Sequence, residues 1–264
     1  MVMLAKEIKE SELNQFEGWI AQRKEDGERC IAEIDNGIIT LRNRKNADIT
    51  LRYPEIVIGL AKMPVKAVLD GEITSLTEKF NDLQQRSHLS KELILLIRVK
   101  QFPCKFVAFD ILEKEGRNLR NLVLGIRLKK LNELKRYESS YFKITETGKP
   151  KEMWYKAKEQ GWEGIILKND FSIYEDKRSS SWVKLKVYKE AIVKVLGYTS
   201  ENREISALET EKGKVNFCFG KELSNYWISK IKAKAENIYA LVSYLELTAD
   251  NKMRFPILKE LVIK

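Results

Sequence analysis

Hydrophobic and polar residues alternate over short runs through most of the first 187 positions, with turn residues between the runs. This period-two alternation predicts β-strands that are buried on one face. Longer stretches repeat apolar residues every three or four positions and predict amphipathic helices, the last of them ended by Gly161. The predicted strands are RCIAEI, GIITLRN, VKAVLDGEITSL, KFVAFDILE, EGIILKN and SWVKLKVY, and the predicted helices span residues 76–96, 126–138 and 152–161.

The pattern changes after Val187. The remaining residues form short strand-like runs, EAIVKVLGYT, REISALET, KVNFCFG and ALVSYLELT, separated by polar turns, with one helical stretch at 221–234. Several short strands and one helix within about 75 residues are typical of a small barrel of the OB type. We therefore predict a first domain over residues 1–187 and a second over residues 188–264, with a hinge near Tyr188–Ala191.

The composition is that of a globular protein, with 44% hydrophobic and 33% charged residues among 264. Apolar runs stay shorter than the roughly 18 residues that a membrane-spanning helix needs. Lys6, Glu7 and Lys9 interrupt the N-terminal segment, so it lacks the apolar centre of a secretion signal. We expect no membrane partner and a cytoplasmic location, which includes a nucleoid or a viral replication site.

Histidine and cysteine are scarce: the chain has one histidine and three widely spaced cysteines, Cys30, Cys104 and Cys218. This argues against a Ser-His-Asp triad, a disulfide framework and a zinc site. Chemistry carried by Lys, Arg, Asp and Glu suits phosphate transfer with a hard cation such as magnesium. The net charge of +10 favours a polyanionic partner, although an ordinary solvated surface rich in Lys and Glu would also explain it.

The stretch KEDGER, residues 24–29, is by itself a charged turn around an Asp-Gly pair. Four later stretches carry polar or aromatic residues that also have plain structural interpretations. Glu72 fits a solvated strand end, Phe109 a core position and Glu163 a turn, and Lys184 and Lys186 fit the polar face of a half-buried strand. Their order changes the interpretation, because KEDGER, LDGEI, FDIL, EGIILK and WVKLK form a set.

This set resembles the motifs of the ATP-dependent DNA ligases of the covalent nucleotidyltransferase superfamily. KEDGER is similar to motif I, LDGEI to motif III, FDIL to motif IIIa, EGIILK to motif IV and WVKLK to motif V. RYPEI and FNDLQQRS resemble DNA ligases rather than RNA ligases or capping enzymes. The resemblance implies a minimal two-domain form of the α+β class. A nucleotidyltransferase (adenylation) domain with antiparallel sheets and helices would precede a small all-β OB-fold domain.

The resemblance also implies catalytic roles. Lys24 would be the nucleophile that takes AMP from ATP, and a site rich in cations favours the neutral amine that this attack requires. Lys184 and Lys186 would hold phosphates, and two positions apart on a strand they share one face. Glu72 would contact the ribose and, with Glu163, hold Mg²⁺, with Mn²⁺ as a substitute.

Further residues would bind the nucleotide and DNA. By resemblance, Phe109 stacks on adenine and Gln22 lies near the amino edge of the base. Arg29 and Arg44 would hold the ribose and the phosphates of AMP or DNA. Arg86 is a candidate for a basic patch that grips the duplex, and Arg178 resembles another basic position of the family.

The expected reaction seals a 5′-phosphate/3′-hydroxyl nick in duplex DNA. AMP passes from ATP to Lys24 and then to the 5′-phosphate, and it leaves when the 3′-hydroxyl attacks. The nicotinamide-dependent variant carries an extra N-terminal domain and a zinc module, so ATP is the expected cofactor here. A monomer acting on nicked double-stranded DNA is the expected assembly, and an RNA ligase of the same superfamily is the alternative.

The C-terminal run MRFPILKELVIK matches the arginine-rich motif VI of the family only at its start. Arg254 and Pro256 fit, whereas Val262 stands where a second arginine is expected. That motif orients the pyrophosphate leaving group in the family. A ligase that self-adenylates slowly but seals pre-adenylated nicks is therefore a further hypothesis. A nick-binding protein impaired in self-adenylation is the non-catalytic alternative, and the intact Lys24 argues against it.

Overall fold

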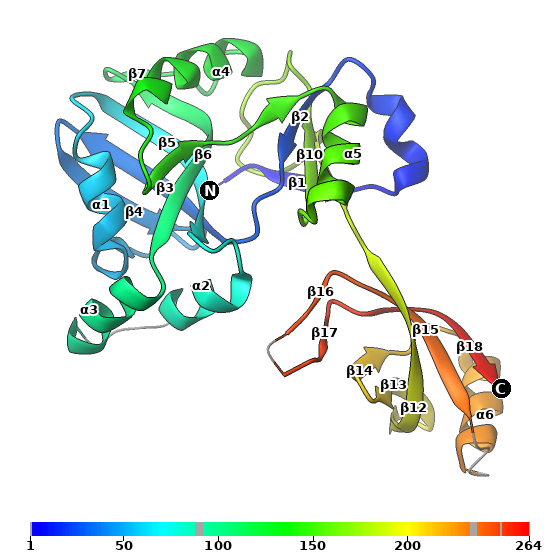
Figure 1. Cartoon of the computed structure of the whole chain (residues 1–264). Helices are drawn as coiled ribbons and strands as arrows, with labels where there is room; N and C mark the ends of the chain where they lie inside the picture. Colours follow the sequence, from blue (N-terminus) through cyan, green and yellow to red (C-terminus); the bar gives the residue numbers. More distant parts are fainter. Residues whose placement is uncertain (1, 88–91, 233–236, 249, 264) are drawn as a thin grey trace. The chain divides into compact units, whose positions relative to one another are not determined.

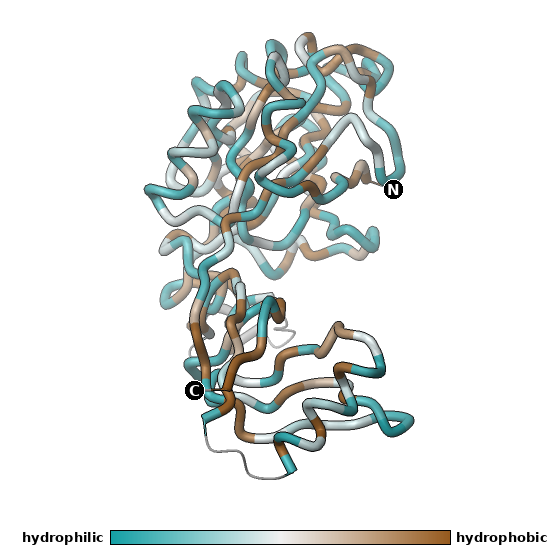
Figure 2. Tube along the Cα trace, turned by 90° about the vertical axis from the view of Figure 1, so that its right-hand side faces the viewer, coloured by the Kyte–Doolittle hydropathy of each residue, from teal (hydrophilic) through white to brown (hydrophobic). Residues whose placement is uncertain are grey.

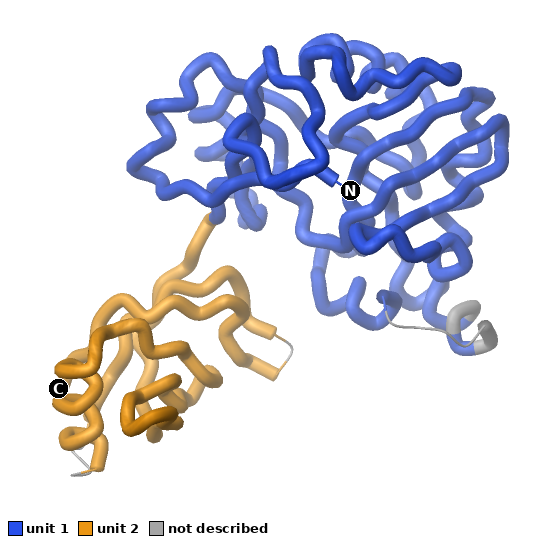
Figure 3. The backbone as a smooth tube through the Cα atoms, turned by 180° about the vertical axis from the view of Figure 1, so that it is seen from behind, with its two compact units in different colours: residues 1–186 blue, residues 187–264 orange. Residues whose placement is uncertain are grey.

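The computed structural model describes residues 2–87, 92–232, 237–248 and 250–263. The chain divides into two compact units, Met1–Lys186 and Val187–Lys264, which Figure 3 shows in different colours. Both units combine antiparallel strand pairs with helices, so the predicted mixture of α and β structure is confirmed. No helix in these described ranges is both long enough and apolar enough to cross a membrane.

A six-stranded sheet forms one half of unit 1 (Figure 1). Its strand order is β4-β3-β5-β6-β7, and β8 pairs with β6 in the parallel direction. Inward and outward residues alternate along the strands, as in β3, where Cys30, Ala32 and Ile34 are buried. The strands are β3 (Glu28–Asp35), β4 (Ile38–Asn43), β5 (Lys66–Ser75), β6 (Cys104–Lys114), β7 (Arg117–Asn118) and β8 (Phe142–Ile144).

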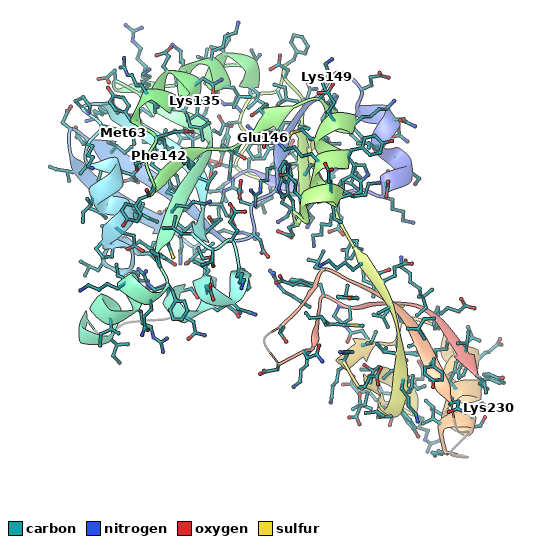
Figure 4. The ribbon with its side chains drawn as sticks, in the orientation of Figure 1. Met63, Lys135, Phe142, Glu146, Lys149 and Lys230 are labelled. Carbon is teal, nitrogen blue, oxygen red and sulfur yellow. The ribbon has the colours of Figure 1, made fainter. Side chains whose placement is uncertain are left out.

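Helices complete the core of this sheet. In α1, the apolar residues Ile56 and Leu60 lie four positions apart and pack into the core. Met63 and Phe142, labelled in Figure 4, belong to the same cluster. The helices are α1 (Pro54–Leu60), α2 (Phe80–Ser87), α3 (Glu92–Gln101) and α4 (Leu124–Asn132), with 3-10 turns η2 (Thr50–Arg52) and η3 (Glu133–Tyr137).

A five-stranded sheet of order β1-β11-β10-β2-β9 forms the other half of unit 1. Its neighbouring strands are antiparallel except β1 and β11, which are parallel. Helix α5 packs on this sheet and ends where the sequence predicted, because Gly161 adopts the left-handed conformation with φ of 67°. The elements are β1 (Leu4–Glu7), η1 (Glu10–Phe16), β2 (Ile20–Arg23), β9 (Thr147–Gly148), α5 (Pro150–Gln160), β10 (Gly164–Lys168) and β11 (Arg178–Lys186).

Unit 2 contains a five-stranded antiparallel sheet of order β14-β13-β12-β15-β18, whose end strands β14 and β18 also contact each other, and the two-stranded antiparallel pair β16-β17. Hydrophobic residues follow these strands in Figure 2, and Val193, Leu208, Val242 and Trp227 pack in the core. The sequence pattern predicts β12 to β15 and α6 but not β18. The elements are β12 (Lys189–Glu201), β13 (Glu204–Thr210), β14 (Gly213–Asn216), α6 (Lys221–Lys232), β15 (Ile238–Tyr244), β16 (Glu246–Leu247), β17 (Met253–Arg254) and β18 (Ile257–Ile263).

Candidate active site

A polar cavity of about 240 Å³ in unit 1 is lined by residues from both of its sheets. The five-stranded sheet contributes residues from β1, β2, β10 and β11, and the six-stranded sheet contributes residues from β3, β5 and β6. Residues far apart in the sequence therefore meet in one place. The cavity is lined by eight of the residues that the sequence motifs indicated, namely Gln22, Lys24, Arg29, Arg44, Glu72, Phe109, Arg178 and Lys184.

Lys24 follows directly after β2 and is tied to the start of β10. Its backbone N–H donates to the carbonyl of Gly164 over 3.0 Å, and its Nζ donates to Oε2 of Glu163. The turn after Lys24 needs glycine, because a Cβ on Gly27 would lie 2.1 Å from the carbonyl oxygen of Ile73. The KEDGER turn thus packs its backbone against β5 while it presents Lys24 to Glu163.

The carboxylates beside Lys24 are strongly affected by burial. Burial raises the pKa of Glu163, and Lys24 opposes this rise. Burial also raises the pKa of Glu72 to about 8, with Arg29 and Lys24 acting in the opposite direction and Glu163 adding to the rise. Desolvation disfavours a charged carboxylate, and a nearby like charge adds to that effect. Two such carboxylates close together favour the approach of a cation.

Arg29 is fixed at the cavity wall by Asp70, a residue that the motif analysis did not single out. The Nε and Nη2 atoms of Arg29 each lie 2.6 Å from an oxygen of the Asp70 carboxylate. The hydroxyl of Tyr174 donates to the same carboxylate over 2.7 Å. The guanidinium carbon lies 4.6 Å from the centroid of the Phe109 ring. This forked pairing holds the guanidinium plane in one orientation.

The inner part of the cavity combines an aromatic ring with unused hydrogen-bonding atoms. Gln22 is buried, and its Nε2 donates to the carbonyl of Phe109 over 3.2 Å. Among the described residues, neither Oε1 of Gln22 nor Nε1 of Trp182 has a hydrogen-bond partner. Buried polar atoms without partners are uncommon in proteins. A ligand with its own donors and acceptors would satisfy them.

Lys168 is a further cavity residue that the motif analysis did not assign. It is buried, and its Nζ lies 3.8 Å from the centroid of Trp182 and 4.5 Å from that of Phe109. Burial lowers the pKa of Lys168 to about 7. The period of two along β10 could have indicated this position, because Lys168 and the cavity residue Ile166 occupy the same face.

Lys184 and Lys186 both reach one carboxylate, that of Glu7. The Oε2 atom of Glu7 lies 3.1 Å from Nζ of Lys184 and 3.7 Å from Nζ of Lys186. Strand β1 places Glu7 there, because it pairs in parallel with β11 and aligns Glu7 with Lys184. The two lysines therefore share a face, as their spacing predicted. Glu7 was not among the predicted site residues.

The comparison with known proteins agrees with this arrangement. Residues 2–186 match the family described as the ATP dependent DNA ligase domain. The chain belongs to the ATP-dependent DNA ligase family.

The curated ligase relatives differ in length. The chain is 31% identical over 206 residues to the bifunctional non-homologous end joining protein LigD of Bacillus subtilis, a match that covers 70% of this chain and 34% of LigD. It is 30% identical over 192 residues to the SPbeta prophage-derived DNA ligase-like protein LigB of the same organism, covering 70% of this chain and 67% of LigB. The chain thus spans about a third of the length of the Bacillus LigD protein.

Solved ligase structures share the fold over nearly the whole chain. The ligase domain of M. tuberculosis LigD has a TM-score of 0.63 at 23% identity and covers 99% of this chain and 94% of that domain. A Lig E DNA ligase has a TM-score of 0.66 at 21% identity and covers 99% of this chain and 98% of its own.

One residue predicted to contact DNA, Arg86, does not lie at the protein surface. Arg86 is fully buried and cannot touch a duplex. Its Nη1 lies 2.7 Å from Oε1 of Glu55 and donates to the carbonyl of Phe102 over 3.0 Å. Arg86 lies one helical turn after the core residue Leu83 in α2, so it faces inward. The prediction of Arg86 as a DNA-binding residue is wrong.

The other basic residues of the predicted set lie at or beside the cavity. Arg44 is exposed and also lines an adjoining hollow of about 760 Å³ together with Arg52 and Gln84. Arg178 is exposed, and its Nη1 donates to the carbonyl of Ala5 over 2.5 Å. Both can be reached from solvent, as a contact with DNA requires.

Proposed function

We propose that this chain is an ATP-dependent DNA ligase that seals 5′-phosphate/3′-hydroxyl nicks in duplex DNA. One observation carries the proposal: Lys24, paired with the buried Glu163, lies at a cavity whose inner wall offers an aromatic ring and an unpaired amide oxygen. An amine beside a cavity that offers an aromatic ring, an unpaired acceptor and basic side chains fits the transfer of AMP to a lysine.

Adenine fits the inner part of the cavity. The unpaired Oε1 of Gln22 can accept a hydrogen bond from the 6-amino group of the base. Phe109 offers a ring face for stacking, and Trp182 packs edge-on against it with centroids 6.1 Å apart. The orientation of the Gln22 amide is fixed, because only its Nε2 can donate to the Phe109 carbonyl. These contacts favour ATP as the nucleotide.

The cations of the site would bind and polarise the phosphates. Lys184, Lys186 and Arg29 place positive charge near Lys24, where negative charge develops on phosphate oxygens during the transfer. In the first step the neutral Nζ of Lys24 attacks the α-phosphate, the N–P bond forms and pyrophosphate leaves. The same AMP would then pass to the 5′-phosphate of the nick, and the 3′-hydroxyl would displace it.

Glu72 and Glu163 fit the role of magnesium ligands. Burial raises the pKa of both carboxyl groups, and repulsion from Glu163 raises the pKa of Glu72 further. A bound cation would relieve both effects, and Mg²⁺ typically binds through one or two carboxylates together with substrate phosphates. Magnesium would there neutralise charge on the phosphates.

The DNA would bind to exposed basic residues, among them Arg44 and Arg178, and the net charge of +10 supports such a partner. In unit 2, α6 lies between the third and fourth long strands and the end strands β14 and β18 are in contact, which supports an OB barrel. We propose that unit 2 is an OB-fold domain that contributes to duplex binding, and that the chain acts as a monomer.

Transfer of label from ATP labelled at the α-phosphate, with Mg²⁺ present, tests the proposal. The wild-type protein should become labelled and should seal nicked DNA but not nicked RNA. Lys24→Ala should take no label, and Lys151→Ala, which changes an exposed lysine of α5, should behave as wild type. Label on Lys24→Ala would refute the choice of nucleophile. Absence of label on the wild type, with or without sealing of a pre-adenylated nick, would refute complete ligase activity.

A further inference from the structure

The carboxylate of Glu7 is a shared counter-ion of the two lysines of β11, Lys184 and Lys186. Its Oε2 atom lies 3.1 Å from Nζ of Lys184 and 3.7 Å from Nζ of Lys186. One carboxylate oxygen thus serves two ammonium groups, which is the way a phosphate oxygen would also be bound between them. The segment that carries Glu7 begins the chain, whereas the lysines lie at the end of unit 1.

The backbone fixes this arrangement. Strand β1 pairs in parallel with β11, aligning Lys6 with Val183 and Glu7 with Lys184. The N–H of Ile8, the next residue, donates to the carbonyl of Lys184 over 3.1 Å. The Glu7 side chain therefore starts from a defined point beside β11, and only its side-chain torsions need to change for the carboxylate to leave the lysines.

Exposure makes the contact replaceable. The side chain of Glu7 is 43% exposed, against 26% for Lys184 and 12% for Lys186. The lysines are therefore the more fixed partners, and the carboxylate is the partner that can turn out into solvent and leave its place beside the lysines to another anion. Pairs as exposed as this one contribute little free energy, roughly 0–1 kcal/mol. A group with several negative charges would compete successfully for the same ammonium groups.

We propose that Glu7 is an internal stand-in for phosphate, which holds Lys184 and Lys186 together in the nucleotide-free protein and is displaced by the phosphates of the nucleotide. This inference rests on the proposed function, because it takes these lysines as phosphate ligands. Glu7 is a positioning residue: it acts through the two lysines and touches no reacting atom.

Two opposing effects follow from the charges. Without a counter-charge, two ammonium groups on neighbouring same-face positions repel each other, and Glu7 reduces that repulsion. The carboxylate also competes with any incoming phosphate. Because the pair is half-exposed and the phosphate chain carries several charges, competition is the larger effect. Removing the charge of Glu7 should strengthen phosphate binding by about two- to fivefold.

The variant Glu7→Gln tests this with three ligands measured by calorimetry on the full chain: ATP, inorganic tripolyphosphate and adenosine. Binding of ATP and of tripolyphosphate should tighten by about two- to fivefold, whereas adenosine, which has no phosphate, should bind as in wild type. The gain should shrink at high salt, since the interaction is electrostatic. Glu7→Asp, which keeps the charge, should resemble wild type.

Glu10→Gln is the matched control. Glu10 is an exposed acid three residues further along that pairs with Lys158 and accepts from Nε1 of Trp154, far along the chain from the β11 lysines. It should leave all three affinities unchanged. In steady-state sealing of nicked DNA, Glu7→Gln should lower KM for ATP with little change in kcat, which a merely structural residue would not do.

Equal or weaker tripolyphosphate binding by Glu7→Gln would overturn the inference, and so would an equal tightening for adenosine. These outcomes are separable from a failure of the proposed function. A wild-type protein that takes no label from ATP contradicts the ligase proposal, whereas the tripolyphosphate comparison still reports on Glu7 and its two lysines. A wild type that labels normally, with an unchanged Glu7→Gln variant, contradicts only the role of Glu7.

Discussion

The Nζ of Lys24 donates a hydrogen bond to Oε2 of Glu163, while the backbone N–H of Lys24 donates to the carbonyl of Gly164, the very next residue. Side chain and backbone thus join the KEDGER turn to the start of β10 at the same point. The Glu163 side chain is 8% exposed and that of Lys24 is 21% exposed. The Nζ of Lys24, the proposed nucleophile, is therefore held by a carboxylate that solvent hardly reaches.

Glu163→Gln should reduce label transfer from ATP by about 100-fold, a loss typical of removing a charged group that orients a site and supports its metal. The amide keeps the size of the side chain but removes the charge that pairs with Lys24 and that would attract Mg²⁺. The Mg²⁺ concentration that gives half the maximal rate should rise. Glu33→Gln, at an acid that pairs with Arg42 outside the cavity lining, is the control and should label normally. Unchanged magnesium dependence in Glu163→Gln would contradict this role.

Gln22→Met should weaken the preference for ATP over GTP by about tenfold, the value of roughly one hydrogen bond. On the proposed binding mode, the wild-type Oε1 would accept from the amino group of adenine and would repel the carbonyl that guanine carries at the same position. The amide cannot turn round without losing the bond from Nε2 to the Phe109 carbonyl. Labelling rates with the two nucleotides, each labelled at the α-phosphate, measure the preference. A variant with wild-type discrimination would show that Gln22 does not select the base.

Arg86→Met should destabilise the protein by about 3–5 kcal/mol, since it leaves Glu55 buried beside an apolar side chain. Urea unfolding measures this loss. The salt dependence of DNA binding should stay as in wild type while the variant is folded, because Arg86 is not exposed.

Arg44→Met should show the opposite behaviour. Arg44 is exposed at the cavity, so the substitution should change the unfolding free energy little and should reduce the salt slope of nicked-duplex binding by about one charge. An Arg44 variant with normal DNA affinity and an unaltered slope would remove Arg44 from the DNA-binding surface. Together the two variants separate a buried structural arginine from an exposed binding one.

The sequence predicted the strands and helices well where a local period carried the information. The alternation in KFVAFDILE and EGIILKN corresponds to β6 and β10, and the predicted end of α5 at Gly161 is confirmed. Within residues 76–96, predicted as one helix, the structure has α2 and the start of α3, and residues 88–91 lie outside the described part of the chain. Turn and strand periods are local, so a single sequence is sufficient to read them.

The positions that the sequence analysis missed or misassigned depend on contacts between segments that are far apart in the chain. Asp70 binds Arg29 from 41 residues away, and Glu7 meets Lys184 only because β1 and β11 pair in parallel. The sequence around Arg86 does not distinguish a buried helical arginine from an exposed one. Its burial is explained by the ion pair with Glu55 on α1, a residue far away in the sequence. Side chains that complete a site through such pairing have no local signature in the sequence.

Lys168 should make the stability of the protein depend on pH between about 7 and 10. Burial lowers its pKa from 10.5 to about 7, so in this range the folded protein holds Lys168 neutral while the unfolded chain holds it charged. The unfolded state then binds one more proton, and the unfolding free energy of the wild type rises with pH by at most about 1.4 kcal/mol per unit. Lys168→Met removes this contribution. The unfolding free energy of the wild type should therefore rise relative to that of the variant from pH 7 to pH 10, with no further relative change below pH 6.

Urea unfolding of both proteins at several pH values measures the difference. Lys151→Met, at an exposed position of α5, should run parallel to the wild type. Parallel curves for Lys168→Met as well would mean that Lys168 keeps an ordinary lysine charge inside the cavity, and its contact with the Phe109 and Trp182 rings would then be that of a permanent cation.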